Sequence, residues 1–404
     1  MLRGVREETE QNYFDPTYGG VNLAVEADLA KVRISKAVSI DEALAAIAQF
    51  TLTLDDSHTK FIPPRLNVDV EYGWEMGMIG DRCYITRVKP DSDAARQGVD
   101  VGDALVSVNG YIPDRNSIWR IRYLFEQLRP QPGLHLELIT PAGVSRQLDL
   151  AGQVKKKKQV LDLTGSDGGA DRQTIIQESE RHQYAWQPQT VESIPGVLIY
   201  RLPSFNVSAR EIQRLFQLVR TREVLILDLR GNGGGPLAIL KQLLGGLTPV
   251  EITIGSIRLR NSVETVVTKG AGKYAFAGRL FILIDGGSAS ASETIARAVQ
   301  LMNRGTLIGD RSAGAVMVGQ YRPRVVNDGE KVIDYGAYVT IADVVMSDGG
   351  RLEKKGVEPD FKVLPTADDL AAGRDPALAM ALKFAGHKMD ATAAGLLLPR
   401  RSDW

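Results

Sequence analysis

Cysteine is nearly absent from this chain of 404 residues, which has only Cys83. A single cysteine excludes an intrachain disulfide and a thiolate metal cluster. The flanking sequence DRCYITRV alternates like a strand, so we expect Cys83 to be a small buried hydrophobe. Histidines are also few, and they neither lie at metal-ligand spacing nor form an HExxH motif. They are His58, His135, His182 and His387.

The sequence also lacks an excess of either charge and any long apolar run. The 49 Lys and Arg residues equal the 49 Asp and Glu residues, so no general field attracts nucleic acid or an anionic membrane. The one basic cluster, Lys155–Lys158, has no aromatic residues beside it and is interpreted as a solvated loop. No apolar run approaches a transmembrane span, and the charged N-terminus, MLRGVREETE, does not have the pattern of a signal peptide.

What is present is ordinary for a soluble globular protein: 44% hydrophobic and 24% charged residues, in a length sufficient for two or three domains. Residues 1–65 have the pattern of a helical region. Ser39, with Glu42 three residues later, predicts a capping box before an apolar periodic run. Pro63 and Pro64 then end any helix.

Residues 66–152 change to short alternating strands broken by Gly, Pro and Asp. The stretch VKPDSDAARQGVDVGDALVSVNG resembles the middle of a PDZ domain, and the helix predicted at IWRIRYLFEQLR matches the second PDZ helix. A PDZ domain binds an extended chain end by adding it to a sheet edge. A small β-domain without a ligand is the alternative, because fold alone does not give function.

The second half of the chain has a different pattern. Residues 153–193 are polar and are interpreted as a linker. In residues 194–365, near-continuous apolar runs such as EVLILDL and RLFILID alternate with helical patterns. Such runs are typical of strands covered on both faces, so we predict a mixed α/β core. Residues 366–404 are predicted to form a C-terminal helical tail.

Two glycine-rich turns in this core suggest a site. In RLFILIDGGSASASETIARAVQ a strand ends near Asp285, and a helix begins within Ser288, Ser290 and Ser292. Free N–H groups and the dipole at a helix N-terminus suit an oxyanion, although serines also serve there as N-caps. The second turn, in LILDLRGNGGGPLAIL, can also present N–H groups to an anion. It is not a phosphate loop, since GxxxxGK[ST] is absent.

Together with LIGDRSAG and LEKKGVEPD, these motifs resemble those of the C-terminal processing (tail-specific) serine proteases, and a PDZ domain before the core matches that family's order too. The resemblance implies an α/β core with layers like those of the crotonase and ClpP folds. It implies Ser290 as the nucleophile and an oxyanion hole formed by the N–H groups of Gly233 and Ala291. It also implies polypeptide substrates, no metal or organic cofactor, and a periplasmic or secreted location, leaving a cytoplasmic one open.

The general base departs from the bacterial tail-specific pattern. The position that holds the catalytic lysine in that branch is Ala315 in this chain, and alanine cannot accept a proton. Histidine is suited to proton transfer near neutral pH, and His58 lies in DDSHTKFIPP. The tricorn protease and its relatives resemble the chain at DSHT, at the nucleophile and at ExxGVxPD. That resemblance implies a site formed by Ser57, His58, Ser290 and Glu353.

This set of residues has a physical rationale. A serine hydroxyl needs an adjacent base, and the base needs a third group to fix its tautomer, which Glu353 could supply directly or through Ser57. We therefore predict a serine endopeptidase whose base titrates near ~6.5. The alternatives are that His58 is a structural histidine, that Glu353 is a solvated carboxylate and that Ser57 is a turn residue. Glu293, in the first turn of the helix, is expected to complement the dipole.

Two other functions stay open at this point. One is an inactive family member that binds peptides or small apolar ligands, as the retinoid-binding protein of the retina does within this wider fold family. The other is a scaffold in which only the PDZ domain acts. Retention of both Ser290 and His58 favours the enzyme. No oligomeric state is predicted.

Overall fold

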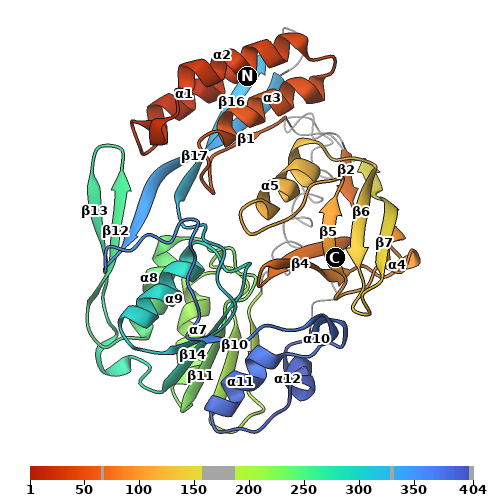
Figure 1. Ribbon diagram of the computed structural model, residues 1–404. Helices are drawn as coiled ribbons and strands as arrows, with labels where there is room; N and C mark the ends of the chain where they lie inside the picture. The colour runs from red at the N-terminus through yellow and green to blue at the C-terminus, as the bar shows by residue number, and fades with distance from the viewer. Residues whose placement is uncertain (65–67, 157–186, 328–331, 400–404) are drawn as a thin grey trace, which may run out of the picture.

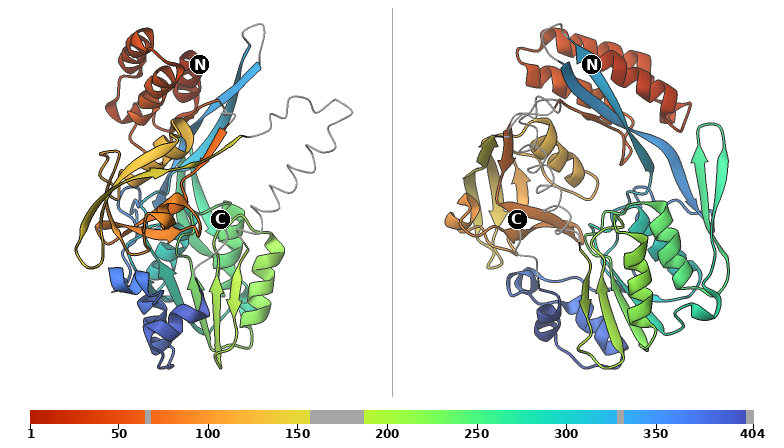
Figure 2. Two further views of the ribbon diagram at one scale, coloured as in Figure 1. Left: turned by 90° about the vertical axis from the view of Figure 1, so that its right-hand side faces the viewer. Right: turned by 180° about the vertical axis from the view of Figure 1, so that it is seen from behind.

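The computed structural model describes residues 1–64, 68–156, 187–327 and 332–399. His182, Lys157 and Lys158 lie outside these ranges. Within them the chain forms four β-sheets and a set of helices (Figure 1), which confirms the predicted mixed α/β class. The N-terminal helices lie at one end of the molecule and the C-terminal helices at the other, as both views of Figure 2 show.

The core is a six-stranded sheet in the order β18-β15-β14-β11-β10-β9. All neighbours in it are parallel except β9, which pairs antiparallel to β10. The strands are β9 Gln189–Val191, β10 Val197–Arg201, β11 Val224–Asp228, β14 Arg279–Ile284, β15 Thr306–Gly309 and β18 Phe361–Lys362. Since parallel strands end at the same edge, the turns that follow β11 and β14 are neighbours in space.

Both faces of this sheet are covered by helices. Leu225 and Leu227 of β11 pack among the helices α7 (Ala209–Val219), α8 (Leu237–Gly246) and α9 (Ala291–Leu301). Ile226, which points to the opposite face, packs against α11 (Pro376–Phe384) and α12 (Ala391–Leu397), which follow α10 (Ala367–Ala371). This arrangement explains why the strands read as continuous apolar runs, since neither face is open to water.

A second sheet joins the core to the N-terminal helices. Its strands are β1 Lys60–Ile62, β12 Ile252–Leu259, β13 Val263–Thr268, β16 Val318–Asn327 and β17 Val332–Met346. The helices α1 (Leu2–Asn12), α2 (Leu23–Lys36) and α3 (Ile40–Leu52), with the short η1 (Tyr18–Gly20), pack on Tyr335 and Val339 of β17. Residues 1–65 therefore share one hydrophobic core with strands of the predicted 194–365 segment.

The N-cap of α3 agrees with the sequence, but the capping box differs slightly. The Ser39 hydroxyl accepts from the Glu42 N–H at 3.2 Å, which confirms the predicted cap. The Glu42 carboxylate, however, accepts from the N–H of Val38 at 3.0 Å, one residue before the cap. The helix start is thus satisfied by both side chains, with the second bond shifted to the preceding residue.

Residues 74–151 form a third unit, called here the five-stranded module. It contains β3 Trp74–Ile79, β4 Arg82–Val88, β5 Ala104–Val108, β6 Gly133–Ile139 and β7 Ser145–Ala151, in that order, with α4 Asp93–Arg96, α5 Ile118–Arg122 and the π-helical turn η2 Tyr123–Leu128. Cys83 is buried in its core, as predicted, and burial raises the pKa of the thiol to about 12. Strand β2 (Val68–Glu71) pairs with β8 (Gln153–Lys156), so the predicted linker 153–193 begins and ends in strands, β8 and β9.

A buried ion pair docks this module onto the core. Arg115 of the module lies 2.5 Å from the carboxylate of Asp310, which follows β15, and it also donates to the carbonyl of Arg311 at 3.0 Å. The same Asp310 carboxylate accepts from the N–H of Gly80 in the β3–β4 turn at 2.8 Å. Because both charged side chains are largely buried, the contact fixes the module beside the segment that follows β15.

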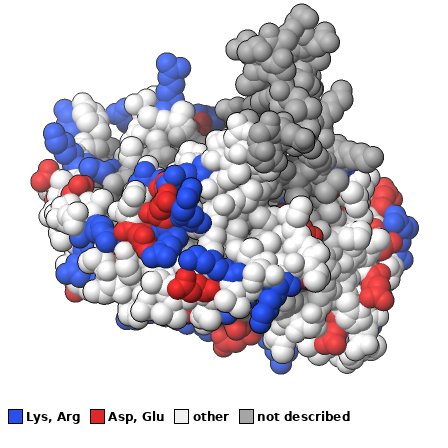
Figure 3. All heavy atoms as spheres, turned by 90° about the horizontal axis from the view of Figure 1, so that it is seen from above, with Lys and Arg blue, Asp and Glu red and all other residues white. Residues whose placement is uncertain are grey.

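The molecular surface carries both signs of charge. Seen from the side of the N-terminal helices, Lys and Arg side chains alternate with Asp and Glu side chains (Figure 3). On the described part of this face the mixed charges do not form the basic stripe that nucleic-acid binding requires. Among the described residues, no helix is both long enough and apolar enough to span a bilayer.

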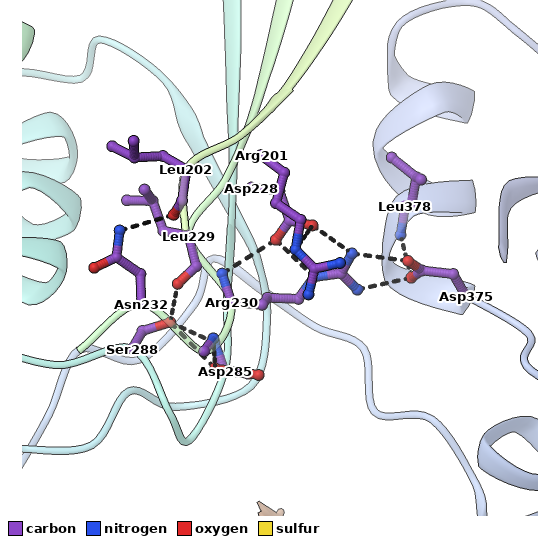
Figure 4. A network of polar contacts seen from close by, with 11 residues as sticks. Arg201, Leu202, Asp228, Leu229, Arg230, Asn232, Asp285, Ser288, Asp375 and Leu378 are labelled. Carbon is purple, nitrogen blue, oxygen red and sulfur yellow. Dashed lines mark hydrogen bonds and ion pairs between the residues drawn. The ribbon is translucent and has the colours of Figure 1, made fainter. Parts of the chain in front are cut away.

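A second buried ion network holds the C-terminal helices against the sheet (Figure 4). Arg230, directly after β11, binds both oxygens of Asp375, the N-cap of α11, at 2.9 and 2.8 Å. It also binds both oxygens of the fully buried Asp228 at 2.8 Å. Burial alone would raise the pKa of Asp228, but Arg230 holds it below its ordinary value. One guanidinium therefore neutralises two carboxylates.

We predict that Arg230→Met lowers the free energy of unfolding by ~3–5 kcal/mol, because it removes the bidentate partner of two carboxylates and leaves the fully buried Asp228 only the longer pair with Arg201, at 4.0 Å. Arg297→Met is the matched control, since its single pair with Asp348 is about one-third exposed on each side and should cost ~1 kcal/mol or less. Urea unfolding of both variants is the measurement. Equal losses in the two variants would contradict this account of the network.

Candidate active site

The two glycine-rich turns meet where β11 and β14 end, and serine side chains join them. The Ser288 hydroxyl donates to the carbonyl of Leu229 at 2.8 Å, and the Ser292 hydroxyl donates to the carbonyl of Asn232 at 2.9 Å. Both hydroxyls are fully buried, and Figure 4 shows Ser288 pointing at the β11 turn. Two of the three serines are thus structural cross-links between the turns.

Ser290 is the serine that faces a cavity. It is the N-cap of α9 and has φ 56° and ψ −114°, a conformation that costs a non-glycine residue ~1–3 kcal/mol. Its N–H donates to the carbonyl of Ala315 at 2.8 Å and to the carboxylate of Glu293 at 3.1 Å. The surrounding hydrogen bonds therefore hold a strained backbone that presents this serine to a cavity of about 530 Å³.

The opposing turn approaches Ser290 closely through glycine. Gly234 has φ +99°, and a Cβ on it would lie 2.6 Å from the Cβ of Ser290, so only glycine fits. Its N–H donates to the Asn232 side chain at 2.8 Å, and the Asn232 amide in turn donates to the carbonyl of Leu202 at 2.8 Å. The turn is thereby fixed on the β10 side as well.

Two backbone N–H groups at this junction have no acceptor. Among the described residues, neither the N–H of Gly233 nor that of Ala291 donates a hydrogen bond, and both residues line the cavity with Ser290. Ala291 is the first residue of α9, where the helix dipole is positive. Free donors beside a hydroxyl at a helix N-terminus are suited to binding an oxyanion.

His58 lines the same cavity from the N-terminal region, and a three-residue relay runs behind it. The His58 Nδ1 lies 2.7 Å from the hydroxyl of Ser57. That hydroxyl donates to Oε2 of Glu353 at 3.0 Å, and the Ser57 N–H donates to Oε1 at 2.9 Å. Glu353 also accepts from the N–H of Val316 at 3.0 Å, so its carboxylate joins three separate segments.

The relay fixes the tautomer of His58. Ser57 has one hydroxyl proton, which it gives to Glu353, so its oxygen can only accept from His58. The imidazole proton must then sit on Nδ1, which leaves Nε2 free to accept a proton. Burial lowers the pKa of His58, an effect that Asp56 opposes and Lys60 reinforces. Burial also raises the pKa of Glu353, against the hydrogen bonds from Val316 and Ser57.

Asp56 anchors the backbone that carries His58. Its buried carboxylate accepts from the N–H groups of His58 at 2.8 Å and of Thr59 at 2.6 Å. It also accepts from the hydroxyl of Thr340 at 2.7 Å, on strand β17. The loop that bears His58 is therefore tied to the sheet that extends from the core.

Glu293 occupies the space behind Ser290. The side chain is fully buried, although Glu293 was expected to complement the dipole at the start of α9. Its carboxylate accepts from the Ser312 hydroxyl at 2.6 Å and from the N–H groups of Gly314 and Ala315 at 2.7 and 2.8 Å, besides that of Ser290. Ala315, at the position that the resemblance to the bacterial tail-specific branch assigns to lysine, thus contributes its backbone N–H to Glu293.

The structure brings Ser290, His58, Gly233 and Ala291 to one cavity and places Ser57 and Glu353 behind His58. Among the described residues, no hydrogen bond joins Ser290 to His58 and no cluster of acidic, histidine or cysteine side chains is arranged to hold a metal ion. The sequence reasoning missed Asp56 and Asn232. Asp56 could have been found, since Asp two residues before a functional side chain favours an Asx turn.

The buried Glu293 makes stability depend on pH. Burial raises its pKa from 4.5 to about 7, against four hydrogen bonds. The folded state therefore binds this proton more tightly than the unfolded state, so the Glu293 contribution to stability is present below pH 4.5 and is lost as the pH rises to about 7.

We predict that Glu293→Gln flattens the fall in the free energy of unfolding over this pH window and costs ~1–3 kcal/mol at its acid end, because an amide N–H₂ must face N–H donors. Urea unfolding at a series of pH values is the measurement. Glu264→Gln, at an exposed glutamate of β13, is the control and should keep the pH dependence of the unsubstituted chain. An unchanged slope in Glu293→Gln would refute the assignment.

Comparisons with known proteins bear on this geometry. Residues 196–363 match the model of Peptidase family S41. The chain is 25% identical over 346 residues to the tail-specific protease of Haemophilus influenzae, a match that covers 79% of this chain and 45% of that protein. It is 24% identical over 405 residues to the putative tricorn protease homolog 2 of Streptomyces coelicolor, covering 92% of this chain and 31% of that protein. The chain thus spans less than half the length of each of these two relatives.

Solved structures share the fold. The photosystem II D1 C-terminal processing protease has a TM-score of 0.54 at 21% identity and covers 96% of this chain and 97% of its own. Mature CPAF complexed with lactacystin has a TM-score of 0.65 at 16% identity and covers 92% of this chain and 95% of its own. The resemblance to the C-terminal processing serine proteases that the motifs indicated is confirmed: residues 196–363 match Peptidase family S41, and a tail-specific protease aligns with most of this chain.

Proposed function

We propose that this chain is a serine endopeptidase that hydrolyses peptide bonds of extended or unfolded polypeptides, with Ser290 as nucleophile and His58 as general base. The match of residues 196–363 to a peptidase family supports polypeptide substrates. The observation that carries the proposal is the relay Glu353–Ser57–His58, which ends at the cavity that Ser290 lines. A relay of this kind is the arrangement that activates a serine hydroxyl.

In the proposed reaction, Nε2 of His58 takes the proton from the Ser290 hydroxyl as its oxygen attacks the peptide carbonyl carbon. The carbonyl oxygen becomes an oxyanion, which accepts hydrogen bonds from Gly233 and Ala291. The C–N bond then breaks, and His58 gives its proton to the leaving amine. Water next gives a proton to His58 and attacks the acyl-enzyme, and the Ser290 oxygen leaves with that proton as the acid product is released.

The relay supports each of these steps. When Nε2 takes a proton the imidazole becomes a cation, and its Nδ1–H still donates to the Ser57 hydroxyl, which donates to Glu353. Glu353 thus stabilises the cation through one intervening hydroxyl. Among the described residues no hydrogen bond joins the Ser290 hydroxyl to His58. Catalytic hydrogen bonds of this kind commonly form or shorten when substrate binds.

The cavity that Ser290 lines is suited to an apolar side chain. Apart from His58, its lining residues carry no ionisable side chain, and aliphatic residues dominate its walls: Leu237, Leu240, Ile254, Ile257, Val266, Val316, Met317, Val318 and Val344. An apolar side chain buried there contributes ~1.5–3 kcal/mol of binding. We therefore expect cleavage next to an apolar residue of the substrate.

We also propose that the five-stranded module acts as a PDZ domain and reads an extended chain end. Strand β3 is at the edge of its sheet, and a cavity of about 270 Å³ between β3 and α5 is lined by Trp74, Met76, Ile121 and Phe125. Addition of a strand to this edge would supply main-chain hydrogen bonds. The mostly extracytoplasmic location of the C-terminal processing proteases favours a periplasmic or secreted location for this activity.

Covalent labelling tests the nucleophile. A serine-directed fluorophosphonate should label the unsubstituted chain, and Ser290→Ala should abolish labelling because only this serine is expected to have an activated hydroxyl. Ser256→Ala is the matched control, since Ser256 lines the same cavity from β12 and should keep the label. Labelling that survives in Ser290→Ala would exclude Ser290 as the labelled nucleophile, and no labelling of the unsubstituted chain would favour the inactive binding protein.

The pH profile of kcat/KM tests the base. His58→Ala should lower kcat/KM by ~10²–10⁴-fold, whereas His135→Ala, at a histidine of the five-stranded module, should not. The neutral imidazole is the active form and burial lowers its pKa, so activity should fall with decreasing pH below the ordinary value of 6.5. Full activity in His58→Ala with a flat profile would exclude His58 as the base.

A further inference from the structure

A second cavity lies behind His58 and Gly233. It has a volume of about 430 Å³, and His58 and Gly233 belong to the walls of both this cavity and the one that Ser290 lines. An extended peptide whose carbonyl reaches Ser290 therefore has room on two sides of the catalytic groups. The residues of the second cavity that matter here are Ser57, His58, Lys60, Gly233, Ala315 and Tyr338.

Lys60 brings a positive charge into this second cavity. It belongs to β1, the edge strand of its sheet, and burial lowers the pKa of its ammonium group, an effect that Glu126 opposes. Its Nζ lies 5.8 Å from the ring centroids of both Tyr123 and Tyr338. Within the described part of the chain, Lys60 makes neither an ion pair nor a hydrogen bond through Nζ.

The two tyrosine rings satisfy this cation only in part. A cation–π contact attracts the charge but accepts no conventional hydrogen bond, and an ammonium group has three N–H donors. A partly buried cation without an acceptor is costly, so the site is set up for an anion that enters the cavity. The apolar cavity beside Ser290 has no such cation, which makes the two sides of the catalytic groups chemically different.

We propose that Lys60 binds a carboxylate of the substrate on the side of the scissile bond that leaves with the amine. The inference rests on the proposed peptidase function. The apolar cavity takes the side chain beside the attacked carbonyl, and His58 must deliver its proton to the leaving amine, so we assign the second cavity, which also has His58 in its wall, to the leaving side. The carboxylate is either the free C-terminus of a short leaving segment or an Asp or Glu side chain in it.

Protection of Ser290 from the fluorophosphonate reports occupancy of this site and not of the five-stranded module. The probes are three forms of one acetylated peptide of Ala, Val and Leu: one ending in a carboxylate, one ending in an amide, and one ending in an amide with Glu in its last half. For the unsubstituted chain, the amide form should need a concentration about tenfold or more above that of a carboxylate-bearing form to halve the labelling rate, as a charge-assisted hydrogen bond requires.

This ratio should fall to about one in Lys60→Met and in Lys60→Gln, and Lys60→Arg should retain it. Lys383→Met, at an exposed lysine of α11, is the matched control and should keep the full ratio. Protection by the Glu-containing amide would identify a side chain as sufficient, and protection by the free acid alone would identify the chain end. A ratio near one in the unsubstituted chain, or a ratio that survives both neutral variants, would overturn the inference. Failure to label Ser290 at all would instead reject the peptidase function.

Discussion

The site depends on hydroxyl groups that bond backbone carbonyls across two neighbouring turns. The parallel strands β11 and β14 end at the same edge, and the hydroxyls of Ser288 and Ser292 add two side-chain bonds between their turns to the backbone bond from Ala289 to Asn232. These bonds together hold the Gly233 N–H near the start of α9. They also leave the middle serine, Ser290, as the one that the turn directs outward. Catalytic geometry on loops needs this kind of rigid support from a scaffold.

A second constraint brings His58, the proposed base, to the cavity of Ser290, the proposed nucleophile. His58 comes from the N-terminal region, whereas Ser290 comes from the core, and no single sheet carries both. The Glu353 carboxylate bridges them, because it binds Ser57 on one side and the N–H of Val316 on the other. Asp56 adds a bond to Thr340 of β17. The segment that carries His58 is thus held by two carboxylates that each join distant segments.

The strands and turns of this arrangement could be predicted from the sequence. The contacts between distant segments could not, because they depend on tertiary structure. Continuous apolar runs predicted the covered sheet, and the Gly-rich turns after two of them predicted where a site would form. The separate roles of the three serines were not readable, since Ser292 bonds a carbonyl 60 positions away. The choice between a direct and a Ser57-mediated contact of Glu353 depended on how two distant loops align. The predicted segment boundaries missed that β17 packs against the N-terminal helices, because a strand's neighbours are set by tertiary structure.

The relay of Glu353, Ser57 and His58 has a consequence for the nascent polypeptide during its synthesis. Ser57 and Glu353 are 296 positions apart, so a ribosome must release all of the intervening chain before the two can meet. Contacts of such long sequence separation form late, after local structure has been established. A nascent or truncated chain that lacks the segment after β17 therefore has no Glu353 to orient His58, the proposed base, through Ser57. The fold itself thus delays the assembly of this relay until the ribosome has released Glu353.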